Sequence, residues 1–364
     1  MTDKGQRQAL AREAVRKKLP EWSSVAELRF PQHISLEQCS SQQTAEYKAR
    51  LINPSETASF VDLTGGFGVD CYYIGRHFSK VTYIEQNPDL CETARHNYAV
   101  LQYSCGVFCM NSEEYLKEMS PVSLIFIDPA RRDNNGRRTY AIEDCTPDVG
   151  RLNALLLEKA SKTIIKLSPM FDWHKAVSDL KGVTEVHIVS VGNECKELLL
   201  VLEREVKPLK LFCANDDDRI EICPISSADF APTCADINDY KYMYEPNASI
   251  MKAGCFNEIA RMYALEAVSC NSHLFLSNRK TNDFPGRKFE ILAVSSLNKK
   301  EVKAKLSGIE KANITTRNFP MKAEELRRRL KLGDGGDIYI FATTTKENKH
   351  IMLVCKKIFT NFAK

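Results

Sequence analysis

The stretch FVDLTGGFGVD, residues 60–70, decides the fold of this chain. It begins as an apolar strand, turns through glycines and leads into a helix that starts near Val69. Gly65, Gly66 and Gly68 can take positive φ and carry no Cβ, so a ligand can approach the backbone amides and the helix N-terminus. A carboxylate and a phosphate both fit such a turn, and the turn alone does not choose between them.

Two common nucleotide-binding motifs are incomplete in this stretch. The dinucleotide fingerprint G-x-G-x-x-G, counted from Gly66, reaches Cys71 where its third glycine is needed. The G-K-[ST] ending of the P-loop is also absent. The sequence therefore disfavours NAD and nucleoside triphosphates as ligands.

Outward from this stretch, short apolar strands alternate with helices. We predict strands at residues 59–63, 81–85, 106–110, 122–128, 162–167, 185–191 and 197–203, and helices near 69–78, 88–101 and 147–161. Strands that alternate with helices form parallel sheets covered on both faces. We therefore predict an α/β fold with a doubly wound, mostly parallel sheet of seven strands, the last two forming a hairpin.

The 364 residues exceed what one hydrophobic core normally supports, so we expect several domains. Amphipathic helices occupy residues 1–50, and the sheet domain spans 51–205. After Glu203 the strand–helix rhythm stops, and prolines with an acidic run at 216–218 indicate a boundary. We predict a linker and a small α+β domain at 206–285, and a second α+β layer with two helices at 286–364.

Composition is ordinary for a globular protein, with 43% hydrophobic and 27% charged residues. The N-terminus lacks a signal-like apolar run, and no window approaches the roughly 18 apolar residues of a membrane span, so we expect a cytoplasmic protein without membrane contact. The 13 cysteines form no C-x-x-C pair, which argues against a zinc site and a disulfide framework, and we expect no metal. A net charge of +4 is weak evidence for a polyanionic partner. Nothing indicates the oligomeric state.

Two acids end predicted strands at the edge where open α/β sheets bind ligands. Glu85 ends the strand 81–85, where a carboxylate can accept hydrogen bonds from both hydroxyls of a ribose. Asp128 ends the strand 122–128, and Pro129 restricts its backbone, so that its carboxylate can be held against an acceptor amine. The alternatives are a solvated acid for Glu85 and an ordinary strand-ending turn for Asp128.

Two basic segments suit a nucleic acid. Arg131 and Arg132, followed by Arg137 and Arg138, lie next to Asp128 and can clamp phosphates. A helix predicted at 322–332 presents five cations for an RNA backbone, namely Lys322, Arg327, Arg328, Arg329 and Lys331. Both segments are also compatible with a solvated surface, the helix then being backed by Leu326 and Leu330.

The segment 62–70, Glu85 and Asp128-Pro129 resemble motifs of the class I, Rossmann-like S-adenosylmethionine-dependent methyltransferases, in the family's order on successive strands. The resemblance covers roughly residues 45–205. It implies that the glycine loop holds the methionine end of the donor and that Glu85 holds the ribose, while Ser112 stands where the family often has an Asp for the adenine amine. The implied donor contacts are Asp62, Thr64, Gly65, Gly66, Phe67, Gly68, Glu85, Gln86, Ser112 and Asp128.

The motif at Asp128 departs from two known variants. Exocyclic-amine methyltransferases have a second proline and an aromatic residue where this chain has Ala130 and Arg131, so a flipped base would lack a stacking partner. Pyrimidine C5 methyltransferases need a nucleophilic cysteine, whereas the strand 162–167 is followed by Ser168-Pro169-Met170. We therefore expect direct transfer, with Asp128 and Pro129 as the catalytic residues.

The whole chain more specifically resembles a bacterial methyltransferase family with a C-terminal THUMP-like domain. The likeness lies in IKLSPMFD (165–172), VSVGNECKELLL (189–200), YEPNASIMKAG (244–254) and FPMKAEELRRRLKLGDGGDIYIFAT (319–343). It makes 206–285 a ferredoxin-like region and 286–364 the THUMP-like domain. Because THUMP modules bind structured RNA, it implies a tRNA or rRNA substrate. The expected substrate contacts are Arg131, Arg132, Lys166, Arg327 and Arg328.

Two other functions stay open. The acceptor of the methyl group can be a protein or a small molecule, with the C-terminal region used for docking. Alternatively, the chain is a non-catalytic RNA-binding protein on a methyltransferase scaffold. The segment 193–197, with Lys166 and Asp172, is a further candidate for the acceptor pocket.

Overall fold

The computed structural model describes residues 3–31, 33–55, 57–131, 142–223, 233–234 and 236–359. The chain divides into two compact units, residues 1–217 and 218–364. Each unit has its own sheet and its own hydrophobic core.

The described strands of the first unit form a sheet in the order β10-β8-β9-β7-β4-β1-β2-β3. Neighbours are parallel, except that β9 runs antiparallel to β7 and β8. The strands are β1 (Ser59–Asp62), β2 (Lys80–Glu85), β3 (Gly106–Cys109), β4 (Val122–Ile127), β7 (Ala160–Leu167), β8 (Val183–Val191), β9 (Glu194–Glu203) and β10 (Lys210–Asn215). The order reverses between β1 and β4, so their carboxyl ends flank the crevice where such sheets bind ligands.

The predicted doubly wound α/β fold is confirmed, with one addition. β10 pairs in parallel with β8 and extends the sheet past the hairpin at which we expected it to end. Leu211 and Cys213 of β10 are buried in the first unit, which ends at residue 217, within the acidic run 216–218 that indicated a boundary.

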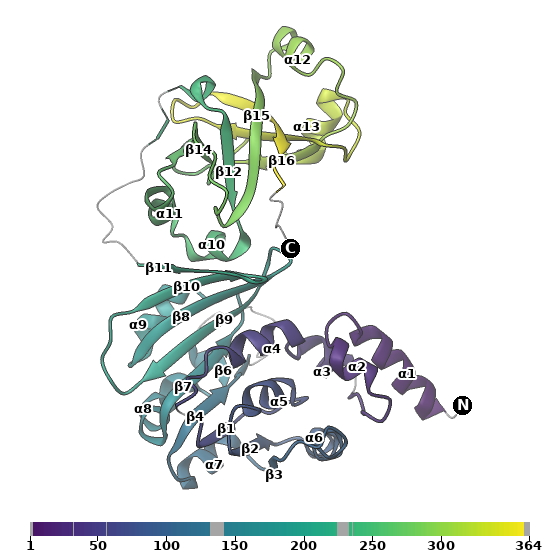
Figure 1. Cartoon of the computed structure of the whole chain (residues 1–364), viewed down its shortest axis with the longest axis vertical. Helices are drawn as coiled ribbons and strands as arrows, with labels where there is room; N and C mark the ends of the chain where they lie inside the picture. Colours follow the sequence, from purple (N-terminus) through teal and green to yellow (C-terminus); the bar gives the residue numbers. More distant parts are fainter. Residues whose placement is uncertain are drawn as a thin grey trace. The chain divides into compact units, whose positions relative to one another are not determined.

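The first unit has helices on both faces of its sheet. Figure 1 shows α4, α5 and α6 on one face and α8 and α9 on the other. The helices are α1 (Asp3–Val15), α2 (Pro20–Ser24), α3 (His33–Gln38), α4 (Gln42–Ala49), α5 (Val69–Gly75), α6 (Pro88–Val100), α7 (Ser112–Glu118), α8 (Val149–Lys159) and α9 (Trp173–Asp179). A small ladder of β5 (Ala130–Arg131) and β6 (Cys145–Thr146) follows β4.

The N-terminal helical segment packs directly on the glycine loop. Trp22 of α2 is fully buried, and its ring lies 5.0 Å from that of Phe67 and 5.6 Å from that of Tyr72. Val15 and Leu19 belong to the same core cluster as these rings. The segment therefore shares the core of the sheet domain, and it supports the loop that follows β1.

The second unit contains a sheet in the order β13-β14-β12-β15-β18-β17-β16 among its described strands. One hydrophobic cluster packs on each side, the first around Phe289 and Phe341 and the second around Ile340 and Leu326. The elements are β11 (Asp218–Ile222), β12 (Tyr242–Pro246), α10 (Ala248–Ala253), α11 (Phe256–Met262), β13 (Glu266–Ala267), β14 (Phe275–Ser277), β15 (Gly286–Ser296), α12 (Lys299–Lys305), β16 (Asn313–Arg317), α13 (Ala323–Leu330), β17 (Ile338–Thr344) and β18 (His350–Lys357). Because β12 pairs with β15, one sheet continues across residue 285.

Candidate functional site

Asp62, the last residue of β1, is a buried acid with one uncommitted oxygen. Its Oδ1 accepts the backbone N–H of Thr64 at 3.0 Å. Its Oδ2 is buried and has no hydrogen-bond partner among the described residues. Burial raises the pKa of Asp62 well above its ordinary value, although the Thr64 N–H opposes this shift. A buried acceptor without a partner is costly, so a ligand that donates a hydrogen bond here would be stabilised.

The glycines after Asp62 are required by close packing and by backbone conformation. A Cβ on Gly65 would lie 2.0 Å from the Tyr83 ring, so only glycine fits. Gly66 has φ +54° and Gly68 has φ +91°, in the left-handed region that glycine adopts without strain. The Tyr83 hydroxyl donates to the Gly66 carbonyl at 2.6 Å and fixes the turn.

Glu85, the last residue of β2, is joined to the glycine loop. Its Oε2 accepts the Gly66 N–H at 3.0 Å, and its Oε1 accepts the Asn87 N–H at 2.9 Å. Each oxygen keeps a further lone pair for a ligand hydroxyl. The loop and the predicted ribose-binding acid therefore belong to one site, as their positions at adjacent strand ends predict.

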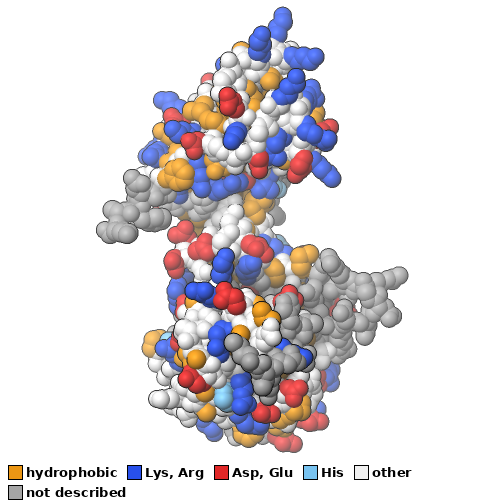
Figure 2. Space-filling model, turned by 90° about the vertical axis from the view of Figure 1, so that its right-hand side faces the viewer, with side chains coloured by type: hydrophobic (Ala, Val, Ile, Leu, Met, Phe, Trp, Pro, Cys, Tyr) orange, Lys and Arg blue, Asp and Glu red, His pale blue; other side chains and the backbone are white. Residues whose placement is uncertain are grey.

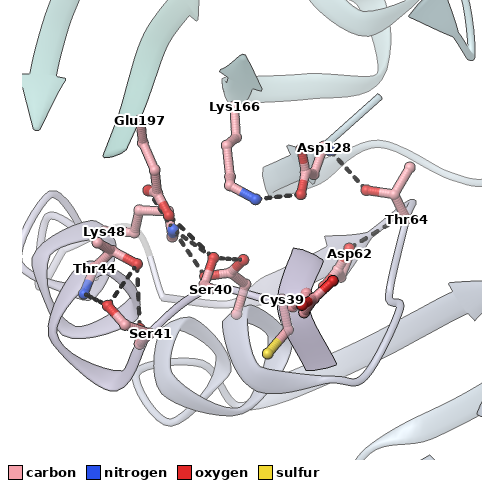
Figure 3. Close-up of polar contacts among 12 residues, drawn as sticks. Cys39, Ser40, Ser41, Thr44, Lys48, Asp62, Thr64, Asp128, Lys166 and Glu197 are labelled. Carbon is pink, nitrogen blue, oxygen red and sulfur yellow. Dashed lines mark hydrogen bonds and ion pairs between the residues drawn. The ribbon is translucent and has the colours of Figure 1, made fainter. Parts of the chain in front are cut away.

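Asp128 follows β4 and is held from both sides. Its backbone N–H donates to Thr64 Oγ1 at 2.6 Å, and its Oδ2 forms an ion pair with Lys166 Nζ of β7 (Figure 3). Burial raises the pKa of Asp128, and the Lys166 ammonium offsets only part of the shift. Burial alone would lower the pKa of Lys166, but the carboxylates around it, Asp128 first, raise it above its ordinary value. Lys166 Nζ and Asp128 Oδ2 therefore face each other as a partly buried ion pair.

A buried ionic cluster lies beside this pair and was not predicted. Lys48 Nζ of α4 lies 2.6 Å from Glu197 Oε2 of β9 and 3.0 Å from Asp70 Oδ1 of α5. Ser40 Oγ donates to Asp70 Oδ2 at 2.6 Å, and Lys48 and Glu197 lie beside Ser40 in Figure 3. Burial alone would raise the pKa of Glu197, but the Lys48 and Lys166 ammonium groups lower it. The cluster ties the N-terminal segment to the first turn of the helix that follows the glycine loop.

Three other predicted donor contacts have different surroundings. The Phe67 side chain is buried against Trp22 and Phe30, so only the backbone of Phe67 is left to contact a donor. Gln86 is exposed beyond β2. Ser112 begins α7, while the preceding Asn111 caps the helix by accepting the N–H of Glu113 at 2.9 Å.

The predicted substrate contacts are only partly described. The Arg132 position and the Arg131 side chain lie outside the described residues. In the second unit, Arg327 donates to Asp334 Oδ1 at 2.6 Å, whereas Arg328 is exposed on α13. Asp172 caps α9 by accepting the His174 N–H at 2.9 Å, which gives it a local structural role.

The residues at the strand ends fit S-adenosylmethionine in three respects. Asp62 Oδ2 is a buried acceptor for a ligand donor. A Cβ on Gly66 would meet nothing nearer than the Thr64 carbonyl at 3.8 Å, so the loop has open space beside it. The Glu85 carboxylate retains lone pairs for two ribose hydroxyls.

The described residues contain neither a metal-binding cluster nor a helix that could span a membrane. No group of three or more His, Cys, Asp and Glu side chains in the described part of the chain is arranged to hold a metal ion. Within the same residues, every helix is too short or too polar to cross a bilayer.

Comparison with known proteins identifies both units. A family model described as THUMP domain-like matches residues 286–357, and one described as a ferredoxin-like domain matches residues 242–285, which confirms the predicted C-terminal fold. The crystal structure of a candidate methyltransferase from Porphyromonas gingivalis W83 is 32% identical, with a TM-score of 0.87, over 96% of this chain and 89% of that chain. No curated protein matches the sequence.

Two weaker structural matches cover about half of the chain. The T. thermophilus 16S rRNA N2 G1207 methyltransferase RsmC, in complex with AdoMet and guanosine, is 12% identical over 48% of this chain and 44% of that chain, with a TM-score of 0.35. M. capricolum TrmK, in complex with S-adenosylhomocysteine, is 13% identical over 44% of this chain and 68% of that chain, also with a TM-score of 0.35. Similarity at this level carries no information about what this chain acts on. The near full-length match does show the family: the chain belongs to the class I, S-adenosylmethionine-dependent methyltransferases that carry a C-terminal THUMP-like domain.

Proposed function

We propose that this protein transfers a methyl group from S-adenosylmethionine to structured RNA, with the acceptor atom held at Asp128. The observation that carries the proposal is the position of the Asp128 carboxylate, fixed by Lys166 and Thr64 beside the glycine loop. The same chain carries a THUMP-like segment, and THUMP modules bind structured RNA.

We assign the donor to the ends of β1 and β2. The glycine loop takes the methionine carboxylate, as helix N-termini with free amides take anions. Asp62 Oδ2 is the acceptor for the donor's ammonium group, and Glu85 accepts from the ribose hydroxyls. Gln86 and Ser112 border the nucleoside.

The donor supplies an already activated methyl group on a sulfonium. The protein therefore has to align the acceptor with the methyl carbon and to receive a proton. The new bond forms between acceptor and methyl carbon as the carbon–sulfur bond breaks, and the donor leaves as a thioether. An acceptor N–H loses its proton to the Asp128 carboxylate, which is paired with Lys166, or to water.

We assign separate tasks to the four predicted segments. Residues 1–50 support the donor loop, 51–205 carry the reaction, and 206–285 with 286–364 hold the RNA. Figure 2 shows Lys and Arg side chains over the face of the second unit that carries α12 and α13. Arg131 and Arg132 at the reaction site and Arg327 and Arg328 on α13 are the proposed phosphate contacts.

The test is transfer of a tritiated methyl group from the donor to total RNA from cells that lack the protein. Wild-type protein should label RNA, Asp128→Asn should bind the donor but fail to label, and the exposed-site control Asp89→Asn should behave as wild type. Label that enters protein or small molecules of a whole-cell extract, but not RNA, would favour a protein or small-molecule acceptor. Failure to bind the donor would leave only the scaffold function.

A further inference from the structure

The second unit holds two half-buried arginines on one buried acid. Glu245 of β12 faces Arg287 of β15 across the strand pair, and its side chain is 3% exposed. Arg287 Nε donates to Glu245 Oε2 at 2.5 Å, and an Nη of Arg317 donates to Glu245 Oε1 at 2.9 Å. The arginine side chains remain 35% and 34% exposed. The ion pairs of the described residues therefore set two guanidinium groups against one carboxylate.

Three buried polar atoms around this cluster have no hydrogen-bond partner among the described residues. They are Arg317 Nε, Thr343 Oγ1 and His273 Nδ1. Arg317 pairs with Thr343 in the register of β16 and β17, so both side chains leave the sheet on the same side. The His273 ring stacks on Phe256 with the ring centroids 4.0 Å apart, and burial, with the Arg317 charge adding to it, lowers the pKa of His273.

The surroundings hold these groups in fixed positions. The Arg287 guanidinium lies 5.7 Å from the Phe289 ring and 5.8 Å from the Phe341 ring. The segment before His273 is attached to the end of β17, because Ser269 Oγ donates to the Thr344 carbonyl at 2.8 Å. A site that is rigid before its ligand arrives loses little entropy on binding.

An oxyanion satisfies this arrangement best. Leaving a buried donor unpaired is unfavourable, and two such atoms on paired positions of adjacent strands, Arg317 Nε and Thr343 Oγ1, indicate a missing ligand. Guanidinium groups offer paired N–H donors that match phosphate oxygens, and a threonine hydroxyl can donate as well.

We propose that Arg287 and Arg317, oriented by Glu245 and assisted by Thr343, form a binding site for one phosphate group. The site lies at the junction of the ferredoxin-like and THUMP-like segments. Its assignment to an RNA phosphate rests on the proposed function, and it is separate from the exposed arginines of α13. A free phosphate offers the same chemistry.

Titrations of the full chain distinguish the two sources. Binding of inorganic phosphate is followed by calorimetry, and binding of a fluorescent RNA hairpin by anisotropy at constant salt. Arg317→Lys keeps the positive charge but loses the paired N–H donors of the guanidinium group. Thr343→Val removes only the unpaired hydroxyl. Matched controls are Arg279→Lys, at an exposed position, and Thr316→Val, on the opposite face of β16.

Both site variants should weaken RNA or phosphate binding about tenfold or more, while both controls stay within about twofold of wild type. Thr343→Val should keep the wild-type unfolding temperature, because the hydroxyl has no partner to lose. If the site variants bind RNA more weakly but phosphate normally, the site is assigned to an RNA phosphodiester. If they also bind phosphate more weakly, the site fits a free anion as well. Wild-type affinity of both site variants for both probes would overturn the proposal. Methyl transfer to RNA is measured separately. If no methyl group is transferred but phosphate binding still depends on Arg317, the proposed function is rejected and the phosphate site is retained.

Discussion

Replacing Lys48 with Met tests the buried ionic cluster that joins the N-terminal segment to the donor loop. The Lys48 side chain is fully buried, and its partners Glu197 and Asp70 are only 4% and 10% exposed. Removing one partner of a buried ion pair costs about 3–5 kcal/mol, because the remaining charge is uncompensated. A domain of this size loses about 2–4 °C in Tm per kcal/mol. Lys48→Met should therefore lower the Tm of the first unit by about 6–20 °C.

The stability that Lys48→Met loses should also depend on pH. Burial alone would raise the pKa of Glu197, but the two lysines, Lys48 first, hold it below its ordinary value. A carboxyl with a lowered folded-state pKa adds stability above its unfolded value of about 4.3, and that stability is lost as the pH falls through the folded value. Because Lys48→Met removes the lowering charge, the difference in stability between wild type and variant should narrow towards pH 4.

Scanning calorimetry of the full chain between pH 4 and 8 measures both effects, since it resolves the two units when they unfold separately. Lys117→Met, at an exposed position on α7, is the control and should change stability by no more than about 0.5 kcal/mol. A Lys48→Met transition equal to that of the control at pH 7 would refute the role of the cluster. A stability difference between wild type and Lys48→Met that does not change with pH would refute this role as well.

Three further predictions concern the strand ends. Glu85→Ala removes two charge-assisted hydrogen bonds to the ribose, each worth about 1.5–3 kcal/mol. The Kd for S-adenosylmethionine should therefore rise by about 100-fold or more in a calorimetric titration. An unchanged Kd would disprove the ribose assignment. Lys166→Met removes the charge that offsets part of the rise in the pKa of Asp128, so the acid limb of the pH–rate profile should move to higher pH. An acid limb at the wild-type position would contradict proton transfer to this carboxylate. Gly65→Ala places a Cβ 2.0 Å from the Tyr83 ring, and urea unfolding should show a loss of about 1–3 kcal/mol; wild-type stability would mean that the loop is not packed as described.

The donor loop and its acids were predictable because each signal lies within one short segment. The glycine turn follows a strand, and Glu85 and Asp128 end the next strands, so parallel topology alone places them at one edge. Their hydrogen bonds in the structure, Glu85 with Gly66 and Asp128 with Thr64, join the predicted partners. The roles assigned to these residues stay predictions.

The ionic cluster and the position of Phe67 were not predictable in this way. Lys48 and Glu197 are 149 residues apart, and only the packing of α4 on the sheet brings them together. The sequence does place Lys48 four residues after Thr44, and therefore on the same face of a helix, which is buried in the structure. Phe67 looks like a loop residue in the sequence, but Trp22 of the N-terminal segment encloses it.

Calorimetric titration of the full chain with S-adenosylmethionine tests the central claim most directly. The strand ends at Asp62, Glu85 and Asp128 predict one saturable site per chain, lost in Glu85→Ala and kept in Asp128→Asn. Absence of binding to wild-type protein, or binding unaffected by Glu85→Ala, would contradict the claim that these strand ends form the donor site.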